Sequence, residues 1–403
     1  MTFTIYLTTE CNFKCKYCYE QFSDHLNLSE KNAFKIVDYI MGVTNEDITI
    51  VFMGGEPLLF KKLIIKIIHY IDTKYRYRNV KYNMTTNASL IDDEIIEVMK
   101  KKDFELRVSI DGNRKTHLIN RISKNGMEYF ETIIRNIDKL KKNNISFAVR
   151  MTVTNNTILD LYENIRFFHE KGYDAIFIGI DFTANYSEKE LDTLYHELEK
   201  IANYYIKEYD KDKKIAIGQI DGKFLNLLCD FHNTFNMCSA GQDTFKILPN
   251  LEVYPCEYLT GNHKFLIGKI GEYIDLNKSK ELAKQLYEVR VPMCEECKIK
   301  DFCFYMKCGY ANYIKTGKIN VPSLTNCKIE KMYYKLTKRI LVHLAQNGYD
   351  ILEIYKTYIE KNDIPISEFG KKYLKYMMQG KYMKRNLFIR FFKECCLNKR
   401  YIY

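Results

Sequence analysis

The chain has 403 residues, of which 46% are hydrophobic and 28% charged, and these proportions exclude global disorder. No stretch approaches the ~18 uncharged apolar residues of a membrane span. Residues 1–9 read as a strand rather than a signal peptide, so we expect a cytoplasmic protein. Thirteen cysteines in such a chain predict metal or redox chemistry rather than a disulfide framework.

The net charge of +11 is unevenly distributed along the chain. Residues 371–403 hold ten Lys and Arg against a single acid, Glu394. A basic tail of this kind can attract an acidic peptide, an anionic membrane or nucleic acid. Its interleaved aromatic residues favour another reading, an amphipathic helix that packs its aromatic side on the body of the protein.

The first 180 residues repeat a strand-then-helix pattern. Apolar residues alternate with period two at Phe104, Leu106, Val108 and Ile110, as in a half-buried strand. Strands are expected at 2–8, 48–53, 80–85, 104–110, 145–153 and 175–180. Each interval is long enough for a crossover helix, so six βα units predict a parallel sheet, either open or curved into a partial barrel.

Helical signals fill the intervals between these strands. Ser29 is placed to cap a helix whose apolar face is Ala33, Val37, Ile40 and Met41. A second apolar stripe falls at positions 63, 64, 67, 68 and 71, and a long helix is expected over about 187–209. Eight cysteines then lie in a loop-rich segment between Cys229 and Cys327, after which helical patterns return.

Three cysteines form a cluster directly after the first expected strand. Cys11, Cys15 and Cys18 have the spacing CxxxCxxC. Three thiolates on one loop can hold three irons of a [4Fe–4S] cluster and leave the fourth iron open. A structural zinc site would need a fourth protein ligand, which is not evident nearby.

This pattern, with an aromatic residue before its last cysteine, resembles the signature of the radical S-adenosylmethionine (SAM) enzymes. The resemblance extends to motifs after the next three strands: GGEP, TTN and SIDG followed by His117 and Arg121. It implies a [4Fe–4S] cluster that binds SAM. The SAM-binding residues implied by the motifs are Tyr17, Gly54, Gly55, Glu56, Pro57, Asn87, Ser109, Asp111 and Arg121.

The later cysteines resemble a SPASM domain, the C-terminal module of peptide-modifying radical SAM enzymes that carries two auxiliary [4Fe–4S] clusters. The resemblance assigns Cys294, Cys297, Cys303 and Cys327 to the outer cluster. It assigns Cys238, Cys256 and Cys308 to the inner cluster. That cluster then has three protein ligands and an open iron, unless Cys229 supplies a fourth ligand. A zinc ribbon on Cys294, Cys297, Cys303 and Cys308 is the structural alternative.

Glu257 follows Cys256 directly. In the related anaerobic sulfatase-maturing enzymes an Asp at the matching place acts as a base on the substrate. The resemblance therefore implies a catalytic base at Glu257, while a solvated loop carboxylate is the other reading.

The resemblance covers residues 1 to about 330 and implies the architecture of the chain. An α/β domain with a partial (β/α)6 TIM-type barrel is expected over 1–220. A cysteine-rich, SPASM-like iron–sulfur domain is expected over 221–330, and a helical basic extension over 331–403.

The implied activity is reductive cleavage of SAM to a 5′-deoxyadenosyl radical that abstracts hydrogen from a residue of a ribosomally made precursor peptide. The expected product is a thioether or carbon–carbon crosslink. Formylglycine formation by an anaerobic sulfatase maturase is the alternative, and a metal-binding RNA or protein interaction module is a third reading. Expected partners are a peptide or protein substrate and a reduced flavodoxin- or ferredoxin-type electron donor, without membrane or nucleic acid.

Overall fold

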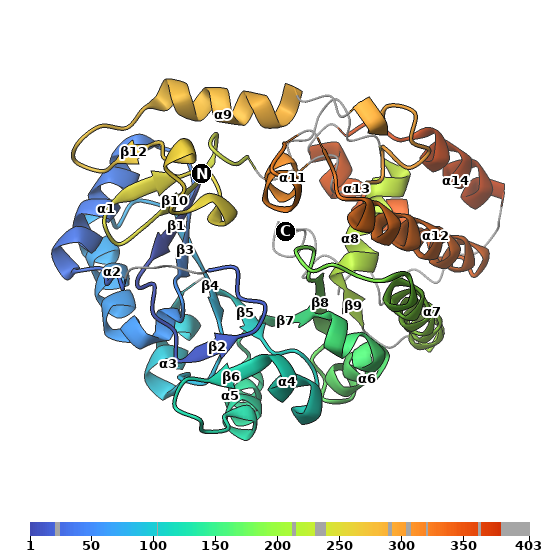
Figure 1. Cartoon of the computed structure of the whole chain (residues 1–403), viewed down its shortest axis with the longest axis horizontal. Coiled ribbons are helices and arrows are strands. Elements are labelled where there is room, and N and C mark those ends of the chain that lie inside the picture. The colour runs from blue at the N-terminus through green and yellow to red at the C-terminus, as the bar shows by residue number, and fades with distance from the viewer. Residues whose placement is uncertain are drawn as a thin grey trace. The chain divides into compact units, whose positions relative to one another are not determined.

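The computed structural model describes residues 1–20, 25–102, 104–211, 215–229, 239–288, 292–303, 308–319, 321–361 and 364–379 (Figure 1). The chain forms two compact units. The first unit comprises residues 1–150 and 238–288, and the second comprises 151–237 and 289–403. The expected domain boundaries after residues 220 and 330 remain a prediction.

The first unit is built on a parallel sheet. Strands pair side by side in the order β1 (Thr2–Tyr6), β3 (Ile48–Met53), β4 (Val80–Thr86), β5 (Phe104–Ser109) and β7 (Phe147–Val153), of which residues 147–150 belong to this unit. All five were expected from the sequence, within two residues at each end. In β3 and β5 buried and part-exposed residues alternate, which is the period-two pattern that predicted them.

Helices connect these strands along the outside of the sheet (Figure 1). The Ser29 hydroxyl accepts a hydrogen bond from the Asn32 amide and caps the first helix, as predicted. The expected apolar faces of the first two helices are buried. The helices are α1 (Glu30–Val43), α2 (Lys61–Lys74), α3 (Asp93–Lys101), α4 (Arg114–Asn120) and α5 (Phe130–Lys142).

Residues far along the chain extend the same sheet. Strand β10 (Thr244–Ile247) pairs in parallel with the free edge of β1, and β11 (Glu252–Tyr254) and β12 (Gly268–Lys269) follow antiparallel. A long helix, α9 (Leu276–Glu288), ends this segment. The sequence patterns did not predict these three strands, which have two to four residues each and show no clear periodicity.

A separate two-stranded ladder lies at the cysteine loop. Strand β2 (Phe13–Cys15) pairs antiparallel with β6 (Arg121–Ser123). The ladder places Cys15 directly opposite Arg121. It thereby joins two motifs that are more than a hundred residues apart in the sequence.

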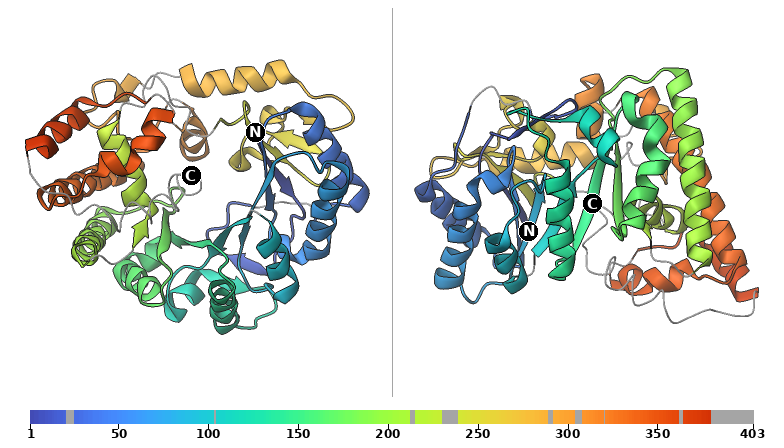
Figure 2. Two further views of the ribbon diagram at one scale, coloured as in Figure 1. Left: turned by 180° about the vertical axis from the view of Figure 1, so that it is seen from behind. Right: turned by 90° about the horizontal axis from the view of Figure 1, so that it is seen from below.

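The second unit contains the expected strand β8 (Ala175–Ile180), which pairs in parallel with β9 (Ala216–Ile217). The long helix predicted over about 187–209 is α7 (Glu188–Asp210), and Ser187 and Glu190 cap it reciprocally. Figure 2 shows α7 beside α12 (Leu324–Gln346), the other long helix of this unit. The remaining helices are α6 (Leu161–Glu170), α8 (Gly218–Leu228), α11 (Gly309–Thr316), α13 (Ile351–Lys361) and α14 (Glu368–Gln379).

The basic C-terminal segment begins as a packed helix. Tyr373 in α14 is buried, donates its hydroxyl to the Tyr349 carbonyl and accepts the Ile351 amide, both at 2.9 Å. This agrees with the helical tail expected from the sequence. Residues 380–403 carry most of the Lys and Arg residues of the basic segment 371–403 and lie outside the described residues. Across the described ranges, no helix is both long and apolar enough to cross a bilayer.

Candidate functional site

The three N-terminal cysteines lie on one loop after β1. Cys11 interacts electrostatically with both Cys15 and Cys18, so the three thiols converge. The Phe13 amide donates to Cys11 Sγ at 3.3 Å, and burial raises the pKa of the Cys11 thiol to about 12. Within the described ranges no three His, Cys, Asp or Glu side chains are grouped tightly enough for a single metal ion. The thiolates of a [4Fe–4S] cluster bind different irons, and three converging thiols on one loop fit that ligand set.

A buried ion pair supports the middle cysteine. Arg121 Nη1 lies 3.9 Å from Cys15 Sγ, and Arg121 Nε lies 3.2 Å from Asp111 Oδ1. Tyr17 donates its hydroxyl to both oxygens of Asp111, at 2.9 and 2.7 Å. Burial alone would lower the pKa of Arg121, but the charge of Asp111 raises it well above its ordinary value. Tyr17, Asp111 and Arg121, all predicted to bind SAM, therefore bind one another.

The GGEP loop packs directly on the cysteine loop. The amides of Gly55 and Glu56 donate to the carbonyls of Thr8 and Glu10 at 3.0 and 2.9 Å. A Cβ on Gly54 would lie 2.4 Å from the Thr8 oxygen, and a Cβ on Gly55 would lie 2.2 Å from the Glu10 oxygen. Close approach of two backbones therefore requires both glycines.

The Glu56 carboxylate is buried and is hydrogen-bonded to neighbouring groups. It accepts hydrogen bonds from the Leu58 amide at 3.0 Å, the Thr86 hydroxyl at 2.7 Å and the Asn87 amide at 2.8 Å. Burial raises its pKa, and these three donors oppose the rise. The carboxylate thus ties the loop after β3 to the loop after β4, and Pro57 starts a short buried 3₁₀ turn beside it, η1 (Pro57–Phe60).

Asn87 forms a closed ring with two residues that the motifs did not single out. Asn87 Nδ2 donates to Asn12 Oδ1 at 2.8 Å, Asn12 Nδ2 donates to Ser89 Oγ at 2.9 Å, and Ser89 Oγ donates to Asn87 Oδ1 at 2.6 Å. Asn12 lies between Cys11 and Phe13, so the ring joins the cysteine loop to the end of β4. The only signal for this ring in the sequence is that Asn12 and Ser89 are polar and lie within two positions of Cys11 and Asn87.

Ser109 is the last residue of β5, and the β5–β7 register pairs it with Arg150. It therefore lies at the carboxyl end of a parallel strand, where active sites of such sheets form. Its predicted contact with SAM, like those of Gly54, Gly55, Glu56, Pro57 and Asn87, remains a prediction.

Glu257 lies in the short turn η3 (Glu257–Leu259) after Cys256. Its carboxylate forms an ion pair with Lys246 on β10 at 3.1 Å. Burial opposes ionisation, but Lys246 and Arg150 hold the pKa of Glu257 below its usual range. The carboxylate is thus held in its ionised form, and its role as a base remains a prediction.

Further polar and aromatic groups gather around Glu257. Glu20, two residues after Cys18, interacts with Glu257, Arg150 and the Tyr6 hydroxyl, and burial raises its pKa to about 8. Tyr19 packs edge-on against Tyr258 with ring centroids 5.0 Å apart. The sequence reasoning missed Glu20, Tyr6 and Tyr19, although two of them directly follow the CxxxCxxC motif.

Three of the four cysteines assigned to the outer auxiliary cluster converge in the second unit. Cys294 interacts electrostatically with Cys297 and Cys327, and the Cys297 amide donates to the Cys294 carbonyl at 3.0 Å. Cys294 ends the short turn η5 (Pro292–Cys294), and Cys303 is buried further along the loop that follows this turn. For the predicted inner cluster, Cys256 is half-buried in the first unit and Cys308 precedes α11 in the second, while Cys238 lies outside the described residues.

A buried ion pair lies beside these cysteines. Lys223 on α8 binds Glu330 on α12 at 2.6 Å, with side-chain exposures of 11% and 4%. The Lys223 ammonium also lies 4.6 Å from the centre of the Phe302 ring, next to Cys303. Glu330 is three residues from Cys327 on the same helix. Lys223 and Glu330 therefore connect both cysteine-bearing segments to α8.

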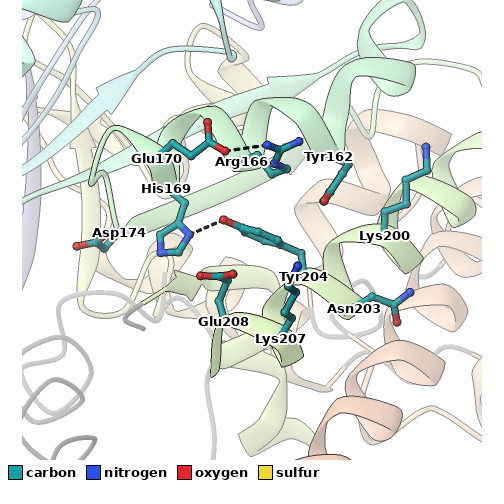
Figure 3. A pocket seen from close by; sticks show the side chains of 10 residues that line it. All are labelled: Tyr162, Arg166, His169, Glu170, Asp174, Lys200, Asn203, Tyr204, Lys207 and Glu208. Carbon is teal, nitrogen blue, oxygen red and sulfur yellow. Dashed lines mark hydrogen bonds and ion pairs between the residues drawn. The ribbon is translucent and has the colours of Figure 1, made fainter. Parts of the chain in front are cut away.

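A cavity of about 920 Å³ lies between α6 and α7 (Figure 3). Arg166 pairs there with Glu170 at 2.8 Å, and His169 Nδ1 lies 2.7 Å from the Tyr204 hydroxyl. None of its lining residues belongs to a recognised motif. Lys200 and Glu208 pair with Glu197 and Lys211, which lie outside the lining, and we assign no chemistry to this cavity.

Comparison with known proteins identifies a family and several relatives of this chain. Residues 5–168 match the family described as the Radical SAM superfamily. An uncharacterised protein of Methanocaldococcus jannaschii is 32% identical over 235 residues, which are 56% of this chain and 82% of that protein. A cysteine-type anaerobic sulfatase-maturating enzyme of Clostridium perfringens is 26% identical over 73% of this chain and 84% of its own. The radical SAM cyclopropyl synthase TigE of Paramaledivibacter caminithermalis is 24% identical over 86% and 75%.

Solved structures show the same fold. The enzyme anSMEcpe with bound AdoMet superposes with a TM-score of 0.73 at 21% identity, covering 87% of this chain and 97% of that one. SuiB of Streptococcus suis bound to its precursor peptide SuiA gives a TM-score of 0.58 at 16% identity, covering 80% and 75%. The fold is therefore the α/β partial barrel expected from the sequence.

A parallel α/β sheet with a three-cysteine loop after its first strand is an arrangement that suits a class of enzymes with an iron–sulfur cluster. The chain belongs to the radical SAM superfamily and is related to the anaerobic sulfatase-maturating enzymes and a cyclopropyl synthase.

Proposed function

We propose that this radical SAM enzyme modifies a residue of a ribosomally made peptide and forms a thioether or carbon–carbon crosslink. The observation that carries this proposal is the second group of converging thiols, at Cys294, Cys297 and Cys327. Such a group fits an auxiliary iron–sulfur cluster, which can accept the electron that a crosslinked product leaves behind. The relation to a cyclopropyl synthase and the fold shared with SuiB in complex with its precursor peptide support a peptide substrate.

In the proposed site, Cys11, Cys15 and Cys18 would hold the cluster that binds SAM, and the two together would supply the radical chemistry of hydrogen abstraction. The protein residues orient this machinery. Arg121 and Asp111 support Cys15, and Glu56 joins the loops after β3 and β4. Glu257, held ionised by Lys246, is the base that receives a proton from the substrate. The proposal also includes the predicted inner auxiliary cluster, with Cys238, Cys256 and Cys308 as its ligands.

Formylglycine formation is a second candidate, because the sulfatase-maturating relative matches 84% of its own length. The two candidates differ in their product. Crosslinking removes two hydrogens and retains both side chains, whereas maturation of a sulfatase cysteine or serine creates an aldehyde.

The decisive experiment uses anaerobically purified, reconstituted enzyme with SAM and a reductant. One reaction receives a peptide with the sulfatase motif, and the other receives a short cysteine-containing peptide encoded beside the gene. Mass spectrometry and an aldehyde-reactive hydrazide distinguish the products. Aldehyde on the first peptide would replace the crosslinking proposal, and 5′-deoxyadenosine without either product would overturn both.

A further inference from the structure

The hydrogen bonds around the ring of Asn12, Asn87 and Ser89 all run in one direction, from donor to acceptor. Each side chain donates one hydrogen bond within the ring and accepts one, at 2.6–2.9 Å. The Ser89 backbone amide also donates to Asn87 Oδ1 at 3.0 Å and fixes the orientation of the Asn87 amide. Reversing the Asn12 amide alone would then set two donors against each other. Asn87 and Ser89 are 5% and 7% exposed, so water cannot easily replace a missing partner.

Two further hydrogen bonds anchor the ring at the loop after β4. The Asn87 backbone amide donates to the buried Glu56 carboxylate at 2.8 Å. Next to Ser89, the Ala88 carbonyl accepts the buried Asn136 amide at 2.8 Å, and Ala88 itself has a positive φ of 61°. The loop after β4 is thus held rigidly, and it presents the Asn87 side chain to the segment that begins at Cys11.

One amide hydrogen of Asn87 is not used within the ring. Asn87 Nδ2 donates one N–H to Asn12 Oδ1 and lies 4.0 Å from Cys11 Sγ. The same sulfur accepts a hydrogen bond from the Phe13 amide at 3.3 Å. Donors directed at a cluster sulfur stabilise the reduced state more than the oxidised state, because the reduced cluster carries one more negative charge.

We propose that the Asn12–Asn87–Ser89 ring is a positioning element that directs the Asn87 amide at Cys11 and raises the reduction potential of the cluster bound there. Asn87 was predicted to bind SAM, and this assigns it a role toward the cysteine ligand. The proposal rests on the radical SAM cluster alone and holds whichever substrate the enzyme modifies.

The test is the midpoint potential of the N-terminal cluster, measured by redox titration with electron paramagnetic resonance on the reconstituted full-length enzyme. The signal that changes on adding SAM identifies that cluster among the others. Ser89→Ala opens the ring at a residue that does not contact Cys11. We expect its equilibrium constant for reduction to fall roughly three- to tenfold, where tenfold corresponds to about 59 mV for one electron.

Three comparisons make the test specific. Ser89→Thr retains the hydroxyl and is expected to keep the wild-type potential. Ser29→Ala removes a helix-capping hydroxyl from the same unit and is expected to leave the potential unchanged. Asn12→Ala opens the same ring, so the Ser89→Ala/Asn12→Ala double variant is expected to shift no further than either single variant. Unchanged potentials in both single variants, or additive shifts, would overturn the proposal.

Loss of the cluster would also be informative. If neither ring variant binds iron, thermal unfolding of the cluster-free proteins decides the question. Stability equal to that of Ser29→Ala, together with lost iron, supports a ring that positions Cys11. A much larger loss of stability would assign the ring a general structural role and overturn the proposal.

Discussion

Arg121 lies opposite Cys15 in the β2–β6 ladder, and its guanidinium joins the Cys15 sulfur to the buried carboxylate of Asp111. One side chain therefore couples the cysteine loop to the end of β5. Tyr17 completes the arrangement by donating to both oxygens of the same carboxylate.

Replacing Arg121 should destabilise the protein strongly. The Arg121→Met substitution leaves the Asp111 charge buried without its cation, which typically costs about 3–5 kcal/mol. Equilibrium urea unfolding of the cluster-free protein measures the effect. Arg114→Met is the matched control, because Arg114 forms an exposed ion pair with Glu128 and its loss should change little. Equal losses in the two variants would contradict the assignment.

Adding one methyl group to the GGEP loop should disturb the cysteine loop. In Gly55→Ala the new Cβ would lie 2.2 Å from the Glu10 carbonyl oxygen, so one of the two backbones must move. We expect less iron per chain after anaerobic reconstitution, with loss confined to the signal that responds to SAM. Gly42→Ala is the control, because a Cβ there meets nothing within 4 Å and should stabilise α1 slightly. Full iron content in Gly55→Ala would show that the loop tolerates the shift.

The Lys223–Glu330 pair should behave as a coupled unit. Lys223→Met or Glu330→Leu alone leaves a buried charge without its partner and should lower the free energy of unfolding by about 3–5 kcal/mol. The double variant should recover much of that loss. Because Lys223 also contacts Phe302 beside Cys303, the single variants should lower auxiliary-cluster iron as well. Lys328→Met, which breaks the exposed pair with Glu188, is the control. Additive effects in urea unfolding would exclude coupling.

Asp221 should make the stability of the second unit depend on pH. Burial raises its pKa to about 7, although the Tyr205 hydroxyl donates to Oδ1 at 2.8 Å and the Ile217 amide to Oδ2 at 2.6 Å. Between pH 4 and 7 the folded state keeps a proton that the unfolded state has released. The free energy of unfolding should therefore fall as pH rises through this window.

The Asp221→Asn variant tests this pH dependence. Its stability relative to wild type should increase from pH 4 to 7 and level off above that range, as measured by urea unfolding at several pH values. Asp192→Asn, at an exposed position of α7, should show no such trend. A constant difference between Asp221→Asn and wild type would contradict the raised pKa.

The parts of the fold that the sequence predicted are those with local signals. Alternation in residues 104–110 and the Ser29 cap depend on neighbours within a few positions, so their patterns indicate structure directly. Strand β2 has three residues and no periodicity, and its partner β6 is identified only by pairing. The same limit applies to the site. The motifs identified Asn87 and Arg121, but their contacts with Asn12 and Cys15 depend on loop packing and strand register.

The pairing of β1 with β10 has a consequence for the order of events during synthesis. Residues Thr2–Ile5 align with Thr244–Ile247, so one edge of β1 stays unpaired until the ribosome has added some 240 residues. At about 5–20 residues per second this takes on the order of ten seconds or more. During that time the strand that precedes the cysteine loop presents an open edge to other chains. Until then, the strand that leads into the cysteine loop has only β3 as a neighbour in the sheet.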